Sequence, residues 1–177
     1  MKKQKGFSLI ELLIVVAIIL IIAAIAIPNL LRSKIAANES SAVGSVRTIG
    51  TAEVTYSSSW GTGYTGLASL GTGGVTPCVA SATSACLIDQ LLSVAPFTKS
   101  GYLFAAGGTL LVNGVNNGFE VNATPSVVGT TGQRSFCDDQ TGVIKFQTSG
   151  AAIGVSAAGG NCAGLATAAG LSGPIGN

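Results

Sequence analysis

The pattern of hydrophobic and polar positions begins with a long apolar stretch. Three lysines precede Gly6, and the 25 residues from Phe7 to Leu31 then contain a single charge, Glu11. A helix rises about 1.5 Å per residue, so this stretch is roughly 37 Å long, enough to cross a hydrocarbon core of about 30 Å. The lysines indicate that this end stays in the cytoplasm and that the rest of the chain is exported.

A second stretch, from Asn29 to about Ser57, has a helical spacing of apolar residues. Its charged residues fall largely between the apolar ones, so we predict an amphipathic helix that continues the first. The apolar positions are Leu31, Ile35, Ala42, Val46, Ile49 and Tyr56. The charged positions are Arg32, Lys34, Glu39, Arg47 and Glu53. Together the two helical parts predict one rod of about 50 residues, roughly 75 Å long if unbroken.

Pro28 stands where the interior of this rod is expected. Proline removes one backbone hydrogen bond and clashes with the preceding turn, so a kink or a break is expected over residues 24–28. Proline is also well tolerated at the first position of a helix, and a separate helix that begins at Pro28 is the alternative. The sequence leaves both open.

Beyond the rod the pattern becomes short and irregular. Residues 61–83 are mostly Gly, Ser, Thr and Ala, and residues 85–94 predict a short helix capped by Ser84. Runs rich in aromatic and β-branched residues then predict a sheet, whose last two strands form a hairpin around the polar turn at 138–142. These runs cover residues 102–105, 109–112, 118–123, 134–137 and 143–147. The Gly-, Ala- and Ser-rich end of the chain, from residue 148, is expected to be tied back through Cys162 and loose over its last residues.

Composition narrows the possible functions. Only 9% of the 177 residues are charged, and there is no histidine, whereas soluble domains carry about 25% charged residues. Histidine is the commonest general base and metal ligand. Because no other catalytic set stands out, we expect neither an enzyme nor a bound cofactor. The nine basic residues, three of them before Gly6, leave no basic face, so direct nucleic-acid binding is not expected.

The four cysteines all lie beyond the apolar stretch, at Cys78, Cys86, Cys137 and Cys162. An even number in an exported segment predicts two disulfides, for which three connectivities are possible. We favour the pairs Cys78–Cys86 and Cys137–Cys162, because each closes a loop rich in Gly, Ser and Thr that has little else to hold it. A zinc site is the alternative, but the spacing contains no C-x-x-C pair.

Asp138 and Asp139 lie side by side in the predicted polar turn. Two carboxylates invite comparison with a calcium site, yet Ca²⁺ takes six to eight oxygen ligands. Adjacent aspartates are far more often turn formers. We therefore predict no metal and keep this pair as a weak calcium candidate.

Glu11 separates three interpretations of the apolar stretch. A secretory signal peptide explains the lysines and the Ala24-Ile25-Ala26 sequence as a cleavage site, and an ordinary membrane anchor explains the length. Neither gains from a carboxylate, which costs about 2.5–3.5 kcal/mol in an apolar span. The third interpretation starts from the sequence GFSLIE, Gly6 to Glu11, followed by the apolar run and Pro28. These residues resemble the N-terminal signature of type IV prepilins and of the related type II secretion pseudopilins.

The resemblance implies a role for each residue of this signature. In that family a membrane-embedded aspartyl peptidase cuts after the glycine and methylates the new N-terminus, which implies cleavage after Gly6 and methylation of Phe7. Glu11 then pairs with the amino group of Phe7 on an adjacent subunit and sets the register of assembly, with its own Phe7 as the competing partner. Many pilins have glycine where this chain has Leu20, so melting of the helix between Leu20 and Pro28 stays open.

A second similarity lies in the predicted sheet. The segments KSGYLF, FEVNATP and GQRSFCDDQTGVIKF follow in the order found in the sheet of type IV pilins and major-pseudopilin-like proteins. The resemblance implies an α+β fold, with a long N-terminal helix packed against a small antiparallel β-sheet head that carries a disulfide-bonded C-terminal loop. The implied parts are a leader (1–6), a transmembrane and polymerisation helix (7–31), the amphipathic half of that helix (32–58) and a globular head (59–177).

The function that the resemblance implies is a structural subunit of a type IV pilus. The precursor is expected in the inner membrane, with its N-terminus in the cytoplasm and its head exported, before polymerisation into an extracellular filament for adhesion, motility, DNA uptake or a related role. Expected partners are other copies of the chain, prepilin peptidase and the inner-membrane assembly machinery. The alternatives are a type II secretion pseudopilin and a monomeric membrane-anchored domain that binds an extracellular ligand.

Overall fold

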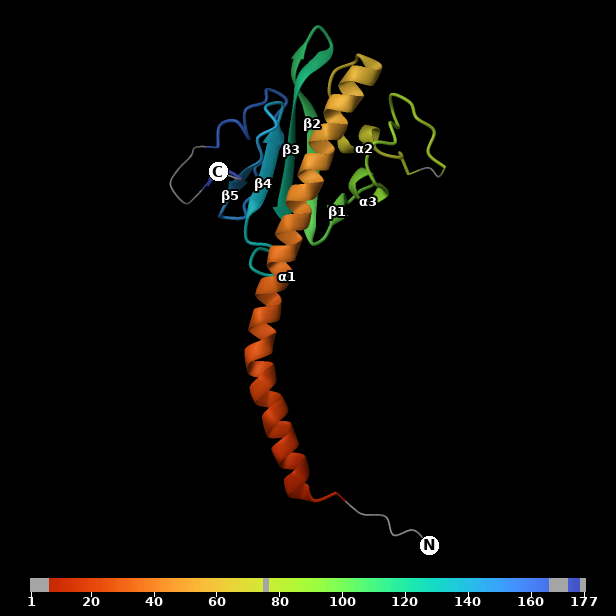
Figure 1. Ribbon diagram of the computed structural model, residues 1–177. Coiled ribbons are helices and arrows are strands. Elements are labelled where there is room, and N and C mark those ends of the chain that lie inside the picture. Colours follow the sequence, from red (N-terminus) through yellow and green to blue (C-terminus); the bar gives the residue numbers. More distant parts are fainter. Residues whose placement is uncertain (1–6, 75–76, 166–171, 176–177) are drawn as a thin grey trace. The chain divides into compact units, whose positions relative to one another are not determined.

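The computed structural model describes residues 7–74, 77–165 and 172–175. The chain divides into two compact units, Met1–Lys34 and Ile35–Asn177, and the second is called the head below. The elements in chain order are α1 (Leu9–Trp60), α2 (Leu67–Leu70), α3 (Gln90–Ser93), β1 (Thr98–Lys99), β2 (Tyr102–Val112), β3 (Val115–Pro125), β4 (Ser135–Asp139), β5 (Lys145–Gln147) and β6 (Ser172–Pro174) (Figure 1). Helix α1 contributes to both units, and every other element belongs to the head. The predicted α+β fold class is confirmed.

Helix α1 is continuous through Pro28. A break, or a separate helix that begins at Pro28, is therefore not found, and the expected kink stays a prediction. Proline removes one hydrogen bond, while the helical turns on both sides keep theirs. The helix ends at Trp60, where Gly61 takes a φ of 65° and its N–H donates to the Ser57 carbonyl at 3.0 Å. Glycine suits this position because a side chain is strained at positive φ.

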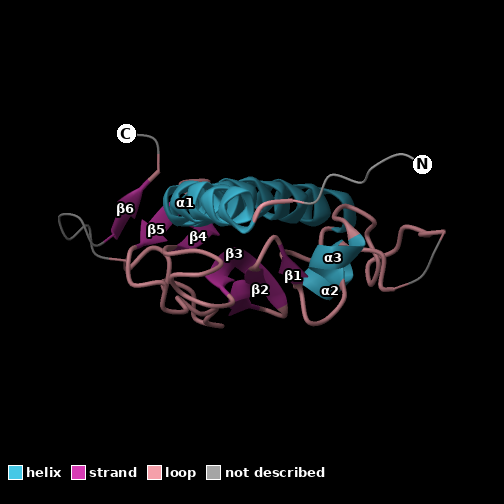
Figure 2. Cartoon of the chain, turned by 90° about the horizontal axis from the view of Figure 1, so that it is seen from below, coloured by secondary structure: helices cyan, strands magenta, loops and turns pink. Residues whose placement is uncertain are grey.

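The core of the head forms between α1 and one face of the sheet (Figure 2). Much of the predicted apolar stripe is buried there, and aromatic and aliphatic side chains of β2, β3 and β4 complete the core. The buried stripe residues are Ala42, Val46, Ile49 and Tyr56. Their largest sheet partners are Tyr102, Phe104, Phe119, Val121 and Phe136. The stripe prediction is wrong on one point, since Glu39 and Glu53 are buried on the same helix rather than solvated.

The sheet is an antiparallel meander whose six strands lie in chain order. Strands β2 and β3 pair around the turn Asn113-Gly114 from Val112 and Val115 to Tyr102 and Pro125, with one interruption at Leu110 and Asn117. Both turn residues have positive φ, 52° and 79°, which is the two-residue hairpin geometry that asparagine followed by glycine favours. The hairpin predicted around residues 138–142 is confirmed as β4–β5, with Phe136 opposite Phe146.

Two parts of the sheet differ from the sequence prediction. The runs 102–105 and 109–112 are one strand, β2, because Gly107 and Gly108 between them stay paired with β3. Strand β6 (Ser172–Pro174) was not predicted, and it pairs with β5 at the edge of the sheet. Glycine and proline are rare inside strands but are accepted at an edge, so the composition of this segment gave no strand signal.

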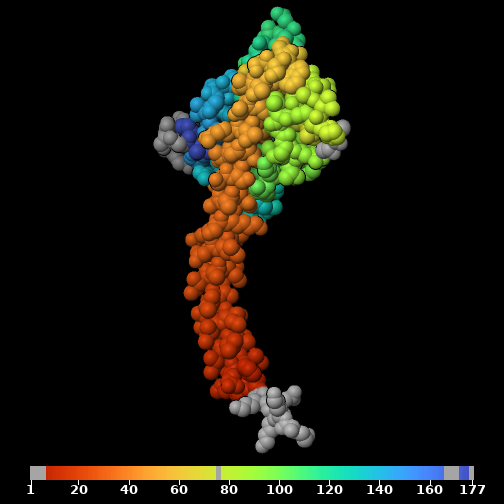
Figure 3. Space-filling model, turned by 45° about the vertical axis from the view of Figure 1, so that its right-hand side comes forward, coloured from red at the N-terminus to blue at the C-terminus, as the bar shows by residue number. Residues whose placement is uncertain are grey.

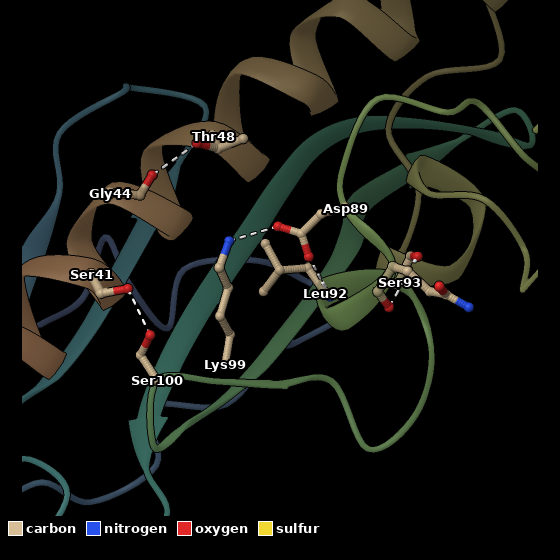
Figure 4. Close-up of polar contacts among 9 residues, drawn as sticks. Ser41, Gly44, Thr48, Asp89, Leu92, Ser93, Lys99 and Ser100 are labelled. Atoms are coloured by element: carbon tan, nitrogen blue, oxygen red, sulfur yellow. Dashed lines mark hydrogen bonds and ion pairs between the residues drawn. The ribbon is translucent and has the colours of Figure 1, made fainter.

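Of the helix predicted at 85–94, only the last turn is confirmed, as α3 (Gln90–Ser93), and the rest of the prediction is wrong. Helix α3 has four residues, and Asp89 rather than Ser84 caps it, through an N–H···O bond of 3.1 Å from Leu92 to the Asp89 carboxylate (Figure 4). The same carboxylate pairs with Lys99 Nζ at 2.6 Å. Helix formation before Asp89 is blocked because the disulfide-bonded Cys86 has a φ of 58°, outside the right-handed helical region.

Residues 148–165, called the strap below, have no regular structure and lie on the face of the sheet opposite α1 (Figure 2). The buried Glu120 carboxylate accepts the backbone N–H groups of Ser156 at 3.1 Å and Cys162 at 3.0 Å. Lys145 Nζ donates to the carbonyl oxygen of Cys162 at 3.1 Å and to the next carbonyl along at 3.0 Å. Polar groups of β3 and β5 therefore fix the strap against the sheet.

Candidate functional site

The first half of α1 presents apolar side chains outward. From Phe7 to Leu31 the large apolar residues expose between 42% and 82% of their surface. Within the described residues, α1 is long and apolar enough to cross a membrane. An apolar surface of this extent needs lipid or other apolar helices around it. Gly6, the expected cleavage position, lies outside the described residues.

Ser8 and Glu11 cap the start of α1. The Ser8 backbone N–H donates to Glu11 Oε2 at 2.9 Å, and the Ser8 carbonyl accepts the N–H of Leu12 at 3.3 Å. Because the helix begins at Leu9, Ser8 and Glu11 hold the cap and third positions of a capping box, in which the acid satisfies the free N–H of the cap residue. The Ser-x-x-Glu spacing signals this bond in the sequence, although the prediction for Glu11 considered only Phe7 as its partner.

Comparison with known proteins bears on this segment directly. Residues 1–27 match the family described as the prokaryotic N-terminal methylation motif. The chain is also similar to the type IV wide pilus major component PilA4 of Thermus thermophilus, with 62% identity over 39 residues. The resemblance of the N-terminal segment to type IV pilins is confirmed. The match covers 22% of this chain and 30% of the relative's length, and no solved structure matches the chain.

The cysteines of the head form two disulfides. Cys78 is bonded to Cys86 with 6.1 Å between their Cα atoms, and Cys137 is bonded to Cys162 with 5.8 Å. Both are the pairs favoured from the sequence. The second bond links β4 to the strap, so it adds a covalent attachment where Glu120 and Lys145 already hold the backbone.

Glu39 and Arg134 join α1 to the segment before β4. Glu39 Oε2 lies 2.8 Å from Arg134 Nε and 2.6 Å from Nη2, and Glu39 Oε1 accepts the backbone N–H groups of Gln133 and Arg134 at 3.0 and 3.1 Å. The guanidinium also lies 5.5 and 5.4 Å from the ring centres of Phe136 and Phe146. This fully bonded carboxylate fixes the helix against the sheet, since both of its oxygens are satisfied by the same segment.

Asp138 and Asp139, the weak calcium candidates, are both buried. Asp138 Oδ1 accepts the backbone N–H of Asp139 at 3.0 Å, and Asp139 Oδ1 accepts that of Thr141 at 2.8 Å. Burial raises the pKa of Asp138 to about 6. The two side chains line a small cavity of about 190 Å³ beside Arg47 of α1. Among the described residues they belong to no cluster of three or more potential metal ligands, and their bonds are those of turn formers.

Glu53 is the most deeply buried acid of the head. It is fully buried on α1, and its Oε2 accepts the Thr65 backbone N–H at 3.0 Å, while Oε1 has no hydrogen-bond partner in the described part of the chain. Burial raises the pKa of Glu53 from 4.5 to about 7, against the lowering effect of the Thr65 bond. The helical spacing gave no sign of this environment.

The stability of the head should therefore depend on pH through Glu53. Between about pH 4.5 and 7 the folded chain keeps the Glu53 proton and the unfolded chain loses it, so the free energy of unfolding falls as the pH rises through this window. Glu53 alone contributes roughly 3 kcal/mol to this fall. Denaturation of the full chain in detergent at pH 4.5 and 7.5 measures it, and Glu53→Gln should remove most of it. Asp138→Asn is the matched control, expected to remove a smaller part. An unchanged fall in Glu53→Gln would contradict this assignment.

Proposed function

We propose that this chain is a structural subunit of a type IV pilus. The observation that carries the proposal is the methylation motif over residues 1–27, joined to a helix whose apolar side chains are exposed from Phe7 to Leu31. A soluble monomer gains nothing from such a surface, whereas a polymer buries it against other copies. The Thermus relative, a major component of a wide pilus, supports a filament as the destination.

In this proposal the precursor enters the inner membrane through residues 7–31, with the lysines in the cytoplasm and the head exported. Export agrees with the two disulfides of the head, which form in oxidising compartments. Prepilin peptidase then removes residues 1–6 after Gly6 and methylates Phe7. Residues 7–31 become the polymerising helix, residues 32–58 its amphipathic continuation and residues 59–177 the outward part of the subunit. The assembly machinery of the inner membrane adds each copy to the growing filament.

A polymer of this kind grows because the contact between copies is heterologous. Each copy uses one surface to meet the copy before it and a different surface to meet the copy after it, so the array stays open and grows. Glu11 and the amino group of Phe7 are the proposed polar pair in an otherwise apolar bundle. There they fix the axial register between neighbouring helices. Pro28, within a continuous helix in the single copy, is the position where the helix bends or melts as copies pack.

Electron microscopy of material sheared from the cell surface tests this proposal. Long filaments are expected, and mass measurement of their subunit should show residues 1–6 removed and one methyl group added at Phe7. If deletion of this chain causes a secretion defect and the unchanged cells carry no surface filaments of it, the chain is instead a type II secretion pseudopilin. A processed or unprocessed chain that stays monomeric in the membrane and forms no filament would identify an anchored binding domain.

A further inference from the structure

The acidic residues of the head are mostly unavailable for ion pairs between the heads of two copies. All seven acidic residues of the chain lie in its described part, and six of them belong to the head. Five of the six, Glu39, Glu53, Glu120, Asp138 and Asp139, are buried. Glu39 is also paired with Arg134, and the remaining acid, Asp89, is paired with Lys99. Contacts between heads therefore depend on neutral surfaces.

One such surface is the end of the β2–β3 hairpin, residues 110–114, called the hairpin tip below. Leu110, Leu111 and Val112 expose 42%, 66% and 56% of their surface. The tip is uncharged. Its far end projects from the rest of the head (Figure 3), while at its base the Leu110 N–H donates to the Ala157 carbonyl of the strap. The turn Asn113-Gly114 holds it in a defined hairpin. Exposed leucines and valine on a projecting hairpin leave a large apolar area in water. Covering this area with a partner is favourable, because apolar surface is then removed from water.

A second neutral surface lies at the other end of the same two strands. A groove of about 380 Å³ runs between the strands and the strap, and it is called the strap groove below. Its lining residues in the described chain are all uncharged: Leu103, Phe104, Ala105, Asn122, Thr124, Pro125, Ser126, Ala152 and Gly154. Leu103 is 45% exposed there, so the groove offers an apolar floor with room for aliphatic side chains.

The groove also holds a polar group without a partner. Asn122 is 95% buried, since only 5% of its surface is exposed, and its Nδ2 has no hydrogen-bond acceptor among the described residues. Buried amide donors are nearly always satisfied, because leaving one unpaired costs about 1–3 kcal/mol. The backbone carbonyl groups of a hairpin turn are acceptors of the kind that this donor lacks.

The two surfaces lie far enough apart to join different copies. Leu103 and Leu111 are eight residues apart on β2, which corresponds to roughly 26 Å along a strand. A contact between the tip of one copy and the groove of another uses different surfaces on the two copies. It therefore leaves a free tip at one end of the array and a free groove at the other, as an open polymer requires.

We propose that the hairpin tip of one copy docks into the strap groove of the next copy. The inference rests on the proposed function, since it concerns the head contacts of the same filament. Leu111 enters the apolar floor beside Leu103, and a carbonyl of the turn accepts the hydrogen bond of Asn122. The strap is then more than a cover for the sheet, because it forms one wall of an assembly surface.

A cysteine pair tests this contact in the full chain. Leu111→Cys with Ser126→Cys should give disulfide-linked ladders from filaments on a non-reducing gel. The matched control is Val79→Cys with Ser126→Cys, because Val79 is 78% exposed on a different loop and should give no ladder. Ladders from both pairs, or from neither, in filaments of normal length would overturn the proposal.

A second pair of variants gives an independent measurement. Leu111→Asp should lower the amount of filament per processed subunit about tenfold or more, because a charge replaces a side chain buried at every contact. Leu111→Met should assemble like the unchanged chain. Equal assembly of both variants would refute the docking while the filament function stands. If the unchanged chain forms no filaments, the proposed function itself fails, whatever these variants do.

Discussion

Replacing Glu11 by alanine is expected to give a subunit that is inserted, cleaved and methylated but does not form filaments. In the proposed bundle the Glu11 carboxylate pairs with the methylated amino group of Phe7 on the neighbouring copy, and its loss leaves that amino group buried without a partner. Losing one member of such a pair costs about 2–5 kcal/mol, which weakens each contact by roughly 30-fold to several thousand-fold. Filament yield by electron microscopy and subunit mass by spectrometry measure both parts of this expectation.

A glutamine at this position separates the two roles of Glu11. Glutamine can still accept the Ser8 N–H in the capping box, but it carries no charge for the Phe7 amino group. Glu11→Gln should therefore keep the start of α1 and still fail to assemble. If Glu11→Gln forms filaments as well as the unchanged chain does, the capping bond rather than the charge is what assembly needs, and the ion pair between copies is refuted.

Removing the Cys137–Cys162 disulfide should have the largest effect on the stability of the head. In the double variant Cys137→Ser, Cys162→Ser the closed loop of 25 residues is opened, and the free energy of unfolding should fall by about 3.5 kcal/mol. The strap should also become sensitive to protease, since Glu120 and Lys145 then hold it without a covalent bond. Denaturation in detergent and mapping of the cleavage positions measure these effects.

The other disulfide supplies the control. Cys78→Ser with Cys86→Ser opens a loop of 8 residues, and the fall in stability should be somewhat smaller, about 2.5 kcal/mol. New cleavage should then lie near residues 78–86 and the strap should stay resistant. Cleavage of the strap in both double variants, or in neither, would show that the Cys137–Cys162 bond does not hold it.

The sequence predicts best those features that depend on neighbouring residues. The apolar span is a matter of local composition, and the buried stripe with Val46 and Ile49 follows from helical spacing. The two strands around the turn near Gly142 also carry a local signal, because a polar turn separates two short aromatic runs. These predictions agree with the structure because few distant contacts can change them.

Distant contacts explain the failures. The spacing of charges on α1 puts Glu39 and Glu53 in solvent, but backbone N–H groups from later segments meet both carboxylates, at Gln133 and at Thr65. Helix α3 is short because the Cys78–Cys86 bond and the backbone of Cys86 exclude a helix before it. The capping role of Glu11 is different, since its signal is local and lay in the Ser-x-x-Glu spacing.

The way in which the strap is attached has a consequence for how this surface can evolve. Glu120 and Lys145 hold it only through main-chain N–H and carbonyl groups, and the Leu110 N–H likewise bonds to the Ala157 carbonyl at 3.0 Å. Among the side chains of the strap, only that of Cys162 takes part in these attachments. Substitutions at exposed alanines of the strap, such as Ala151, Ala158 and Ala163, can therefore change the surface that an antibody or a phage contacts without loosening the attachment. The glycines at positive φ, such as Gly150 and Gly159, do not share this freedom.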